Sequence, residues 1–113
     1  MFLITILFNR VWFPPEQSNK IGKAFVDYLK ENPPDKTIEK NLCIAISSDE
    51  NGVILAYGIG EVMKGKEKEA LMRNTQQNLF LASKIDGVRY KTDIFLDFTE
   101  AYKIIGMAPP PEV

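Results

Sequence analysis

Hydrophobic positions along this chain follow two periods, which predict four strands and two long helices. Residues 2–11 alternate as a strand, and both of its faces are apolar. Residues 53–62 form a second strand with two apolar faces. The faces of the first strand are Phe2, Ile4, Ile6 and Phe8 against Leu3, Thr5, Leu7 and Asn9; those of the other are Val53, Leu55, Tyr57 and Ile59 against Ile54, Ala56 and Val62. Strands of this kind belong in the middle of a sheet.

Apolar residues at a spacing of three and four predict the helices. The first helix begins after Pro14-Pro15 and runs to about residue 31. The second covers about residues 66–85, with Gly87 as its C-terminal cap. A short helix is expected over residues 100–105, with Thr99 as its N-cap. The two long stripes are Ile21, Ala24, Phe25, Tyr28 and Leu29, and Ala70, Leu71, Leu79, Ala82 and Ile85.

Two further strands complete the pattern. Residues 42–47 are joined to 53–62 through Asn51-Gly52, a pair typical of tight hairpins. Residues 88–98 alternate between an apolar face and a face that carries Arg89, Lys91, Asp93 and Asp97, as a half-buried strand does. Gly58 and Gly60 inside the third strand indicate a bulge or a close backbone approach.

The element order β-α-β-β-α-β is the split βαβ, or ferredoxin-like, arrangement. Right-handed crossovers place the strands 2–11 and 53–62 in the centre and the other two at the edges. The apolar faces of the two central strands agree with that order. We therefore expect one α+β domain over residues 1–106, with an antiparallel sheet and two helices on one face, and a flexible Pro-rich tail at 107–113.

Two helices cover only one face of this sheet, so the second face needs another cover. Even the less apolar faces of the central strands carry Leu3, Leu7, Ile54 and Val62. Leaving four such side chains in water forgoes roughly 6–12 kcal/mol, while a whole domain is stable by about 5–15 kcal/mol. A homodimer through the helix-free face is the favoured solution. The alternative is that the terminal helix around Tyr102 and Ile105 folds across it.

Charge and apolar length restrict the partners. The chain has 14 basic and 15 acidic side chains among 113 residues, a net charge of −1. This balance does not favour general nucleic-acid binding. No apolar run reaches the length of a transmembrane helix, and the apolar start lacks the basic region and the cleavage site of a signal peptide. We expect a cytoplasmic protein without a membrane or nucleic-acid partner.

The absence of histidine restricts the chemistry. It removes the commonest general base near neutral pH and the imidazole ligands of haem and zinc. Cys43 is the one cysteine, so a disulfide within the chain is impossible, and the residue is expected to be a small core side chain. No metal site and no cofactor are expected.

Over residues 1–105, the element order and the two-sided hydrophobicity resemble the dimeric α/β-barrel superfamily. The resemblance implies two ferredoxin-like subunits packed sheet against sheet, with a small ligand in a cleft between each sheet and its helices. Members of that group include cofactor-free monooxygenases, haem-dependent enzymes, isomerases and proteins without assigned activity. The haem branch uses a histidine ligand and another branch a His–Asp pair, so the lack of histidine argues against both.

Two groups of side chains are candidates for ligand binding. Asn74 and Asn78 fall inside or beside the apolar stripe of the second helix and can face a polar ligand; alternatively they flank the stripe and bond to loops or solvent. Arg10, Trp12 and Tyr57 can form a mouth for an aromatic or carboxylated molecule, or simply a packing cluster at the end of the sheet.

Tyr90 is a further candidate in the strand 88–98. The carboxylates Asp93 and Asp97 on the other face of that strand can do acid–base work if burial separates their pKa values. Since they alternate with Arg89 and Lys91, a solvated edge strand is the favoured interpretation.

The leading hypothesis is a small homodimer that binds a small molecule in the sheet–helix cleft. The alternative is a cofactor-free monooxygenase or isomerase-type enzyme, in which Asn74, Asn78, Arg10 and Tyr90 position a substrate and stabilise an enolate. A third interpretation is a regulatory module with its ligand at the subunit interface. The sequence identifies neither the ligand nor catalytic residues.

Overall fold

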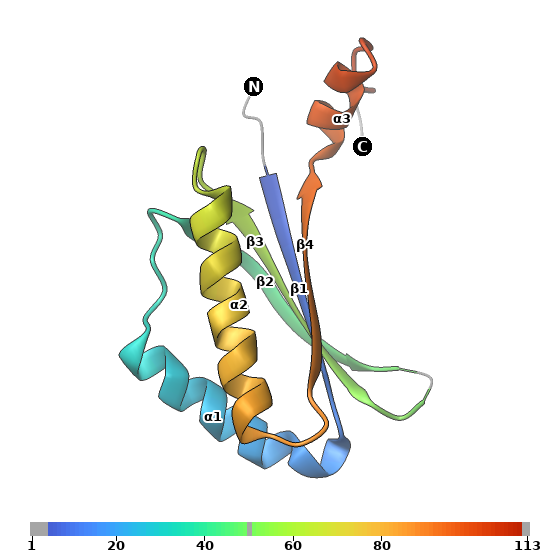
Figure 1. Cartoon of the computed structure of the whole chain (residues 1–113). Helices are drawn as coiled ribbons and strands as arrows, with labels where there is room; N and C mark the ends of the chain where they lie inside the picture. Colours follow the sequence, from blue (N-terminus) through green and yellow to red (C-terminus); the bar gives the residue numbers. More distant parts are fainter. Residues whose placement is uncertain (1–4, 50, 112–113) are drawn as a thin grey trace.

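The computed structural model describes residues 5–49 and 51–111 and folds them into a four-stranded antiparallel sheet with helices packed on one face (Figure 1). The strand order is β2-β3-β1-β4. The elements are β1 (Thr5–Phe13), the 3₁₀ helix η1 (Pro15–Gln17), α1 (Ser18–Glu31), β2 (Glu39–Ser48), β3 (Ile54–Val62), α2 (Glu67–Lys84), β4 (Arg89–Leu96) and α3 (Phe98–Ile104). This confirms the ferredoxin-like α+β fold, with β1 and β3 in the centre. The sequence predictions for Phe2, Leu3, Ile4 and residues 112–113 lie outside the described residues.

Several element boundaries differ from the sequence predictions, three of them as follows. β2 begins at Glu39, before the predicted start at residue 42, because it pairs with β3 as far as Val62. β4 ends at Leu96 rather than at residue 98. The N-cap of α3 is Asp97 and not Thr99, since the Asp97 side chain accepts a 2.9 Å hydrogen bond from the Glu100 amide.

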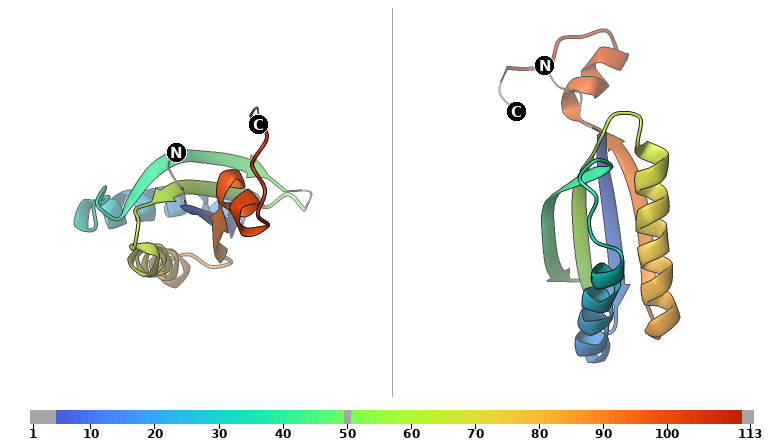
Figure 2. Two further views of the ribbon diagram at one scale, coloured as in Figure 1. Left: turned by 90° about the horizontal axis from the view of Figure 1, so that it is seen from above. Right: turned by 90° about the vertical axis from the view of Figure 1, so that its left-hand side faces the viewer.

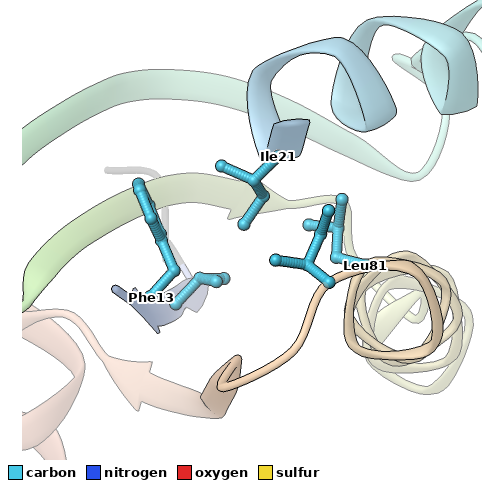
Figure 3. Close-up of a cluster of buried hydrophobic side chains, with 5 residues drawn as sticks. Phe13, Ile21 and Leu81 are labelled. Atoms are coloured by element: carbon cyan, nitrogen blue, oxygen red, sulfur yellow. The ribbon is translucent and has the colours of Figure 1, made fainter. Parts of the chain in front are cut away.

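The two long helices lie on the same side of the sheet, and the edge-on view separates the layers (Figure 2). The larger core cluster forms where the end of β1 meets α1 and the C-terminal part of α2, as Phe13, Ile21 and Leu81 illustrate (Figure 3). The full cluster is Val11, Phe13, Ile21, Leu81 and Ile85. A second cluster of Leu7, Val62 and Ala70 lies toward the other end of the sheet.

The buried stripe of α2 differs from the predicted one. Leu71 and Leu79 are 38% and 53% exposed, whereas Asn78 is fully buried. The stripe predicted for α1 is correct, since Ile21 is buried in the core and Ala24 and Phe25 are partly buried against it. The amide of Asn78 occupies a core-facing position of α2, where Asn9 of β1 is its hydrogen-bonding partner.

The helix-free face is not the less apolar face, to which Leu7, Ile54 and Val62 belong. Leu7 and Val62 are buried under α2, and Ile54 packs against the larger core cluster. The helix-free face instead carries the more apolar side chains of the central strands. Its residues in β1 and β3 are Ile6, Phe8, Arg10, Trp12, Leu55, Tyr57, Ile59 and Glu61.

The described part of the C-terminal segment does not cover that face. α3 extends beyond the end of β4 (Figure 1), and Ile104 and Ile105 are 72% and 64% exposed. Cys43, expected in the core, is exposed instead, because it lies on the edge strand β2 opposite Ile59, on the side without helices. None of the helices among the described residues is long and apolar enough to cross a membrane.

Candidate ligand-binding cleft

A cleft of about 650 Å³ opens between the inner face of β2–β3 and the two long helices. It exists because α2 packs on β1 and β4, which leaves the inner face of β2 without a helix directly above it (Figure 2). Ile44 and Ile46 of β2 line the cleft and are 60% and 68% exposed. Further apolar walls come from Val11, Phe13, Ile21, Phe25, Ile54 and Leu81. Most of the lining is therefore hydrophobic.

Polar side chains line the remainder of the cleft, and Glu39 is the central one. Glu39 stands at the start of β2 and lies across Gly60 of β3, where an added Cβ would overlap its carboxylate. The Asn74 amide of α2 donates a 2.8 Å hydrogen bond to Glu39 Oε1 and a 3.0 Å hydrogen bond to the Ala70 carbonyl. A glycine below and an amide above thus fix the position of this carboxyl group.

The surroundings of Glu39 change its acidity. Burial in the cleft raises the pKa of the Glu39 carboxyl above its ordinary value, while the Asn74 hydrogen bond and the charge of Arg73 act in the opposite direction without cancelling it. A carboxyl group with a raised pKa in an apolar cleft can accept or release a proton during a reaction. Its charged form can also pair with a cationic group of a ligand.

Two further charged side chains line the cleft, and both are already bonded. Asp35 accepts hydrogen bonds from the Thr37 amide at 2.9 Å and the Thr37 hydroxyl at 2.6 Å, which lower the pKa of Asp35. Arg73 Nη2 donates to the Pro33 carbonyl at 2.8 Å. These bonds order the α1–β2 connector beside the cleft.

Asn78 lies deeper than a ligand-contacting residue would. It exchanges hydrogen bonds of 2.8 and 3.1 Å with Asn9 of β1 and donates at 3.1 Å to the Thr92 hydroxyl of β4. Asn9 also lines the cleft, so the floor of the cleft is connected to this buried polar network. Of the two predicted amides, Asn74 lies in the cleft and Asn78 supports its floor.

Arg10, Trp12 and Tyr57 do come together, but on the helix-free face. The Arg10 guanidinium lies 5.6 Å from the Trp12 ring centroid, and its Nη2 is 2.8 Å from Asp93 Oδ2. The Tyr57 ring stacks on Phe8 with centroids 5.7 Å apart. The side chains of Arg10 and Trp12 therefore lie across the sheet from Asn74, whereas Tyr57 is also among the residues that line the cleft.

Tyr90 and the β4 acids take other positions. Tyr90 pairs with Val11 in register, on the helix side of the edge strand, and is 37% exposed. Asp93 is the partner of Arg10, and Asp97 caps α3, so neither carboxylate reaches the cleft. The sequence pattern does not identify Glu39, because it predicts that the strand begins only at residue 42. The signal that could have found it was Gly60 in a central strand, which leaves space for a neighbouring side chain.

These features define a ferredoxin-like domain with a cleft on its helix side and an open sheet face on the other. The fold is similar to a dimeric ferredoxin-like protein from an uncultured marine organism, with a TM-score of 0.51, 12% identity, and coverage of 86% of this chain and 97% of that one. A conserved protein from Methanosarcina mazei Go1 gives a TM-score of 0.51 at 8% identity, over 82% and 91% of the two chains. The de novo designed protein Foldit4 gives 0.54 at 12% identity, over 83% and 98%.

Identities this low establish the fold alone. The ferredoxin-like fold is thus confirmed for this chain, and the resemblance to dimeric α/β-barrel proteins beyond the fold stays a prediction. No protein-family model matches the chain, and no curated protein matches it in sequence.

Proposed function

We propose that this protein is a small homodimer that binds one small molecule in the cleft of each subunit. The observation that carries the proposal is the cleft itself, with its apolar walls and a carboxyl group held in place by Asn74. A volume of about 650 Å³ lies within the range of small-molecule sites. An apolar lining with few fixed polar groups is the usual composition of such sites.

The helix-free face supports the dimer. Phe8, Trp12, Tyr57 and Ile59 are half-buried there and Phe95 is 48% exposed, and these apolar side chains lie around the Arg10–Asp93 ion pair. A second copy can cover it by a two-fold arrangement in which each subunit uses the same residues. The dimeric description of the marine protein of similar fold supports this assembly.

A cytoplasmic location fits the chemistry of Cys43. Its thiol is free and exposed, and such thiols persist in reducing compartments.

We also retain the division into a domain over residues 1–106 and a tail over 107–113, since residues 107–111 form neither helix nor strand.

Native mass spectrometry of the purified chain tests the assembly and the binding together. We expect a dimer mass with additional mass for up to two bound small molecules, which dissociate on collisional activation. A monomer without bound molecules at micromolar concentration, and no binding from a small-molecule library, would contradict the proposal.

A cofactor-free monooxygenase or isomerase is a second candidate function, which the raised pKa of Glu39 favours. A carboxyl group of this kind can accept a proton from an activated substrate carbon. Turnover of candidate quinols by the wild-type chain and by E39Q distinguishes the two functions. An enzyme loses turnover with E39Q, whereas a binding protein shows no turnover in either form.

A further inference from the structure

In the polar part of the cleft, the hydrogen bonds of Asn74 use its donors and leave two acceptor oxygens without a hydrogen bond. The Asn74 amide nitrogen carries two hydrogens, and both are used, one on Glu39 Oε1 and one on the Ala70 carbonyl. Both partners are acceptors, so the orientation of the Asn74 amide is fixed. Among the hydrogen bonds of the described residues, none reaches Glu39 Oε2 or Asn74 Oδ1. A ligand that hydrogen-bonds to these two atoms therefore supplies the donors.

Gly60 fixes the place of these acceptors. Its missing side chain allows the Glu39 carboxylate to lie flat against β3, with Oε2 nearest to the position that a Cβ would take. The carboxylate is thus held between a strand and a helix rather than at the end of a freely moving side chain. An acceptor that is already ordered loses little conformational entropy when a ligand donates to it.

Charge selects among the ligands that carry donors. The cleft is lined by two acids, Asp35 and Glu39, and by one base, Arg73. Asp35 is bonded to Thr37, and Arg73 donates to the Pro33 carbonyl. No salt bridge forms at the half-buried Glu39 carboxylate among the described residues, so the charge of Arg73 acts on it only from a greater distance. A cationic donor offsets the cost of burying this carboxylate, whereas a neutral donor offsets it only in part.

We propose that the cleft recognises a protonated primary amine on an apolar body, with the ammonium group donating to Glu39 Oε2 and Asn74 Oδ1. Its apolar part lies along Ile44, Ile46 and Phe25. An ammonium has three donors and no acceptor, which matches a site that offers acceptors. The inference rests on the proposed function, because it names the class of ligand for the same cleft.

Three probes with the same eight-carbon chain test the head group: 1-aminooctane, 1-octanol and octanoate. Titration calorimetry at neutral pH gives the affinity of each. We expect 1-aminooctane to bind about tenfold tighter than 1-octanol, the gain typical of a hydrogen bond to a charged group. Octanoate is expected to bind most weakly, because its charge repels Glu39.

Two variants locate the effect. E39Q removes the proposed partner of the amine, and E61Q removes the same charge from the helix-free face of β3. We expect E39Q to lose the preference for the amine over the alcohol and to retain alcohol binding, while E61Q keeps the preference. Circular dichroism of each variant verifies that it is folded.

The outcomes separate the two proposals. Equal binding of all three probes, or tighter binding of octanoate, overturns the amine assignment and leaves a binding cleft. An equal loss of preference in E61Q and E39Q shows a general charge effect and also overturns the assignment. If none of the three probes binds the wild-type chain, the amine assignment fails. If the small-molecule library gives no ligand either, the proposed binding function also fails.

Discussion

Asn9 of β1 and Asn78 of α2 exchange two side-chain hydrogen bonds, of 2.8 and 3.1 Å, across the boundary between sheet and helix. Thr92 of β4 completes the network by donating to Asn9 Oδ1 at 2.8 Å. The pair lies between the two apolar clusters of the core, since Asn9 stands between Leu7 and Val11 on the inner face of β1. The hydrogen bonds fix α2 in one register on the sheet, because a shift of the helix would leave both amides buried and unpaired.

Replacing only one member of this pair should be costly. N78L leaves the Asn9 amide nitrogen without its acceptor, and we expect a loss of about 1–3 kcal/mol in the free energy of unfolding. Urea unfolding followed by circular dichroism at one protein concentration measures it. The exposed amide of Gln76 on the same helix provides the control, because Q76L should change stability by less than about 0.5 kcal/mol.

The double variant N9L/N78L distinguishes a hydrogen-bond effect from a packing effect. With both polar partners gone, the loss should be smaller than the sum of the two single losses, by a coupling free energy of about 0.5–3 kcal/mol. Additive losses would show that the two amides act independently, and that the network does not set the register of α2.

The sequence predicted the order of elements and the two central strands because these depend on hydrophobic period and on chain connectivity. It could not predict the buried stripe of α2, because amides are ordinarily exposed and the partner of Asn78 lies 69 residues away in the chain. For a related reason, the sequence could not decide which face of the sheet stays free of helices. Both faces of β1 are apolar, and the decision depends on which face holds the polar partner of the helix.

The candidate site was only partly accessible from the sequence. Asn74 was found because an amide beside an apolar stripe is unusual, while Arg10, Trp12 and Tyr57 were correctly grouped with one another but lie on the other side of the sheet. Glu39 was not predicted as a site residue, because its role depends on the pairing of β2 with β3, which brings it over Gly60. Contacts of this kind are set by register and not by local pattern.

Glu39 should make the stability of the fold depend on pH in a defined direction. Because the pKa of Glu39 is raised in the folded chain, the folded state binds its proton more tightly than the unfolded state does. The free energy of unfolding should therefore fall as pH rises from the ordinary carboxyl range through the raised pKa, and then level off. E39Q should lack this fall.

Comparing wild type and E39Q at each pH isolates the effect. Asp35 has a lowered pKa and contributes stability that is lost as pH falls, but it is present in both chains and cancels in the difference. Urea unfolding between pH 4 and pH 8 supplies the curves. A difference that grows in favour of the wild-type chain with rising pH would contradict the assigned direction.

Gly60 should control the position of Glu39 without controlling the fold. In G60A the new methyl group overlaps the Glu39 carboxylate, a flexible group that can move aside, and the strand backbone at this position suits alanine. We expect the displaced carboxylate to lose its burial, which raises its pKa, together with the Asn74 hydrogen bond, which lowers it. Because burial is the larger effect, the pKa of Glu39 should return toward its ordinary value, with stability changed by less than about 1 kcal/mol. Carbon-13 NMR titration of the Glu39 carboxyl group measures the shift.

The matched control for G60A is G58A. A Cβ at Gly58 would lie 3.9 Å from the Cβ of Asn9, an ordinary contact, and it would leave Glu39 in place. The pKa of Glu39 should stay raised in G58A. The same return to the ordinary value in both variants would mean that loosening of the sheet, rather than displacement of the carboxylate, is responsible.

Ile59 lies on the helix-free face of β3, opposite Phe8, and a lysine there should prevent the proposed dimer. In a two-fold interface the substitution occurs twice, and each new ammonium would be buried without a partner, at a cost of several kcal/mol. We expect the wild-type chain to sediment as a dimer and I59K as a folded monomer. L79K adds the same charge on the outer surface of α2, where Leu79 is 53% exposed, and should remain a dimer. Sedimentation velocity with circular dichroism on the same samples decides the matter, and a dimeric I59K would place the subunit contact elsewhere on the molecule.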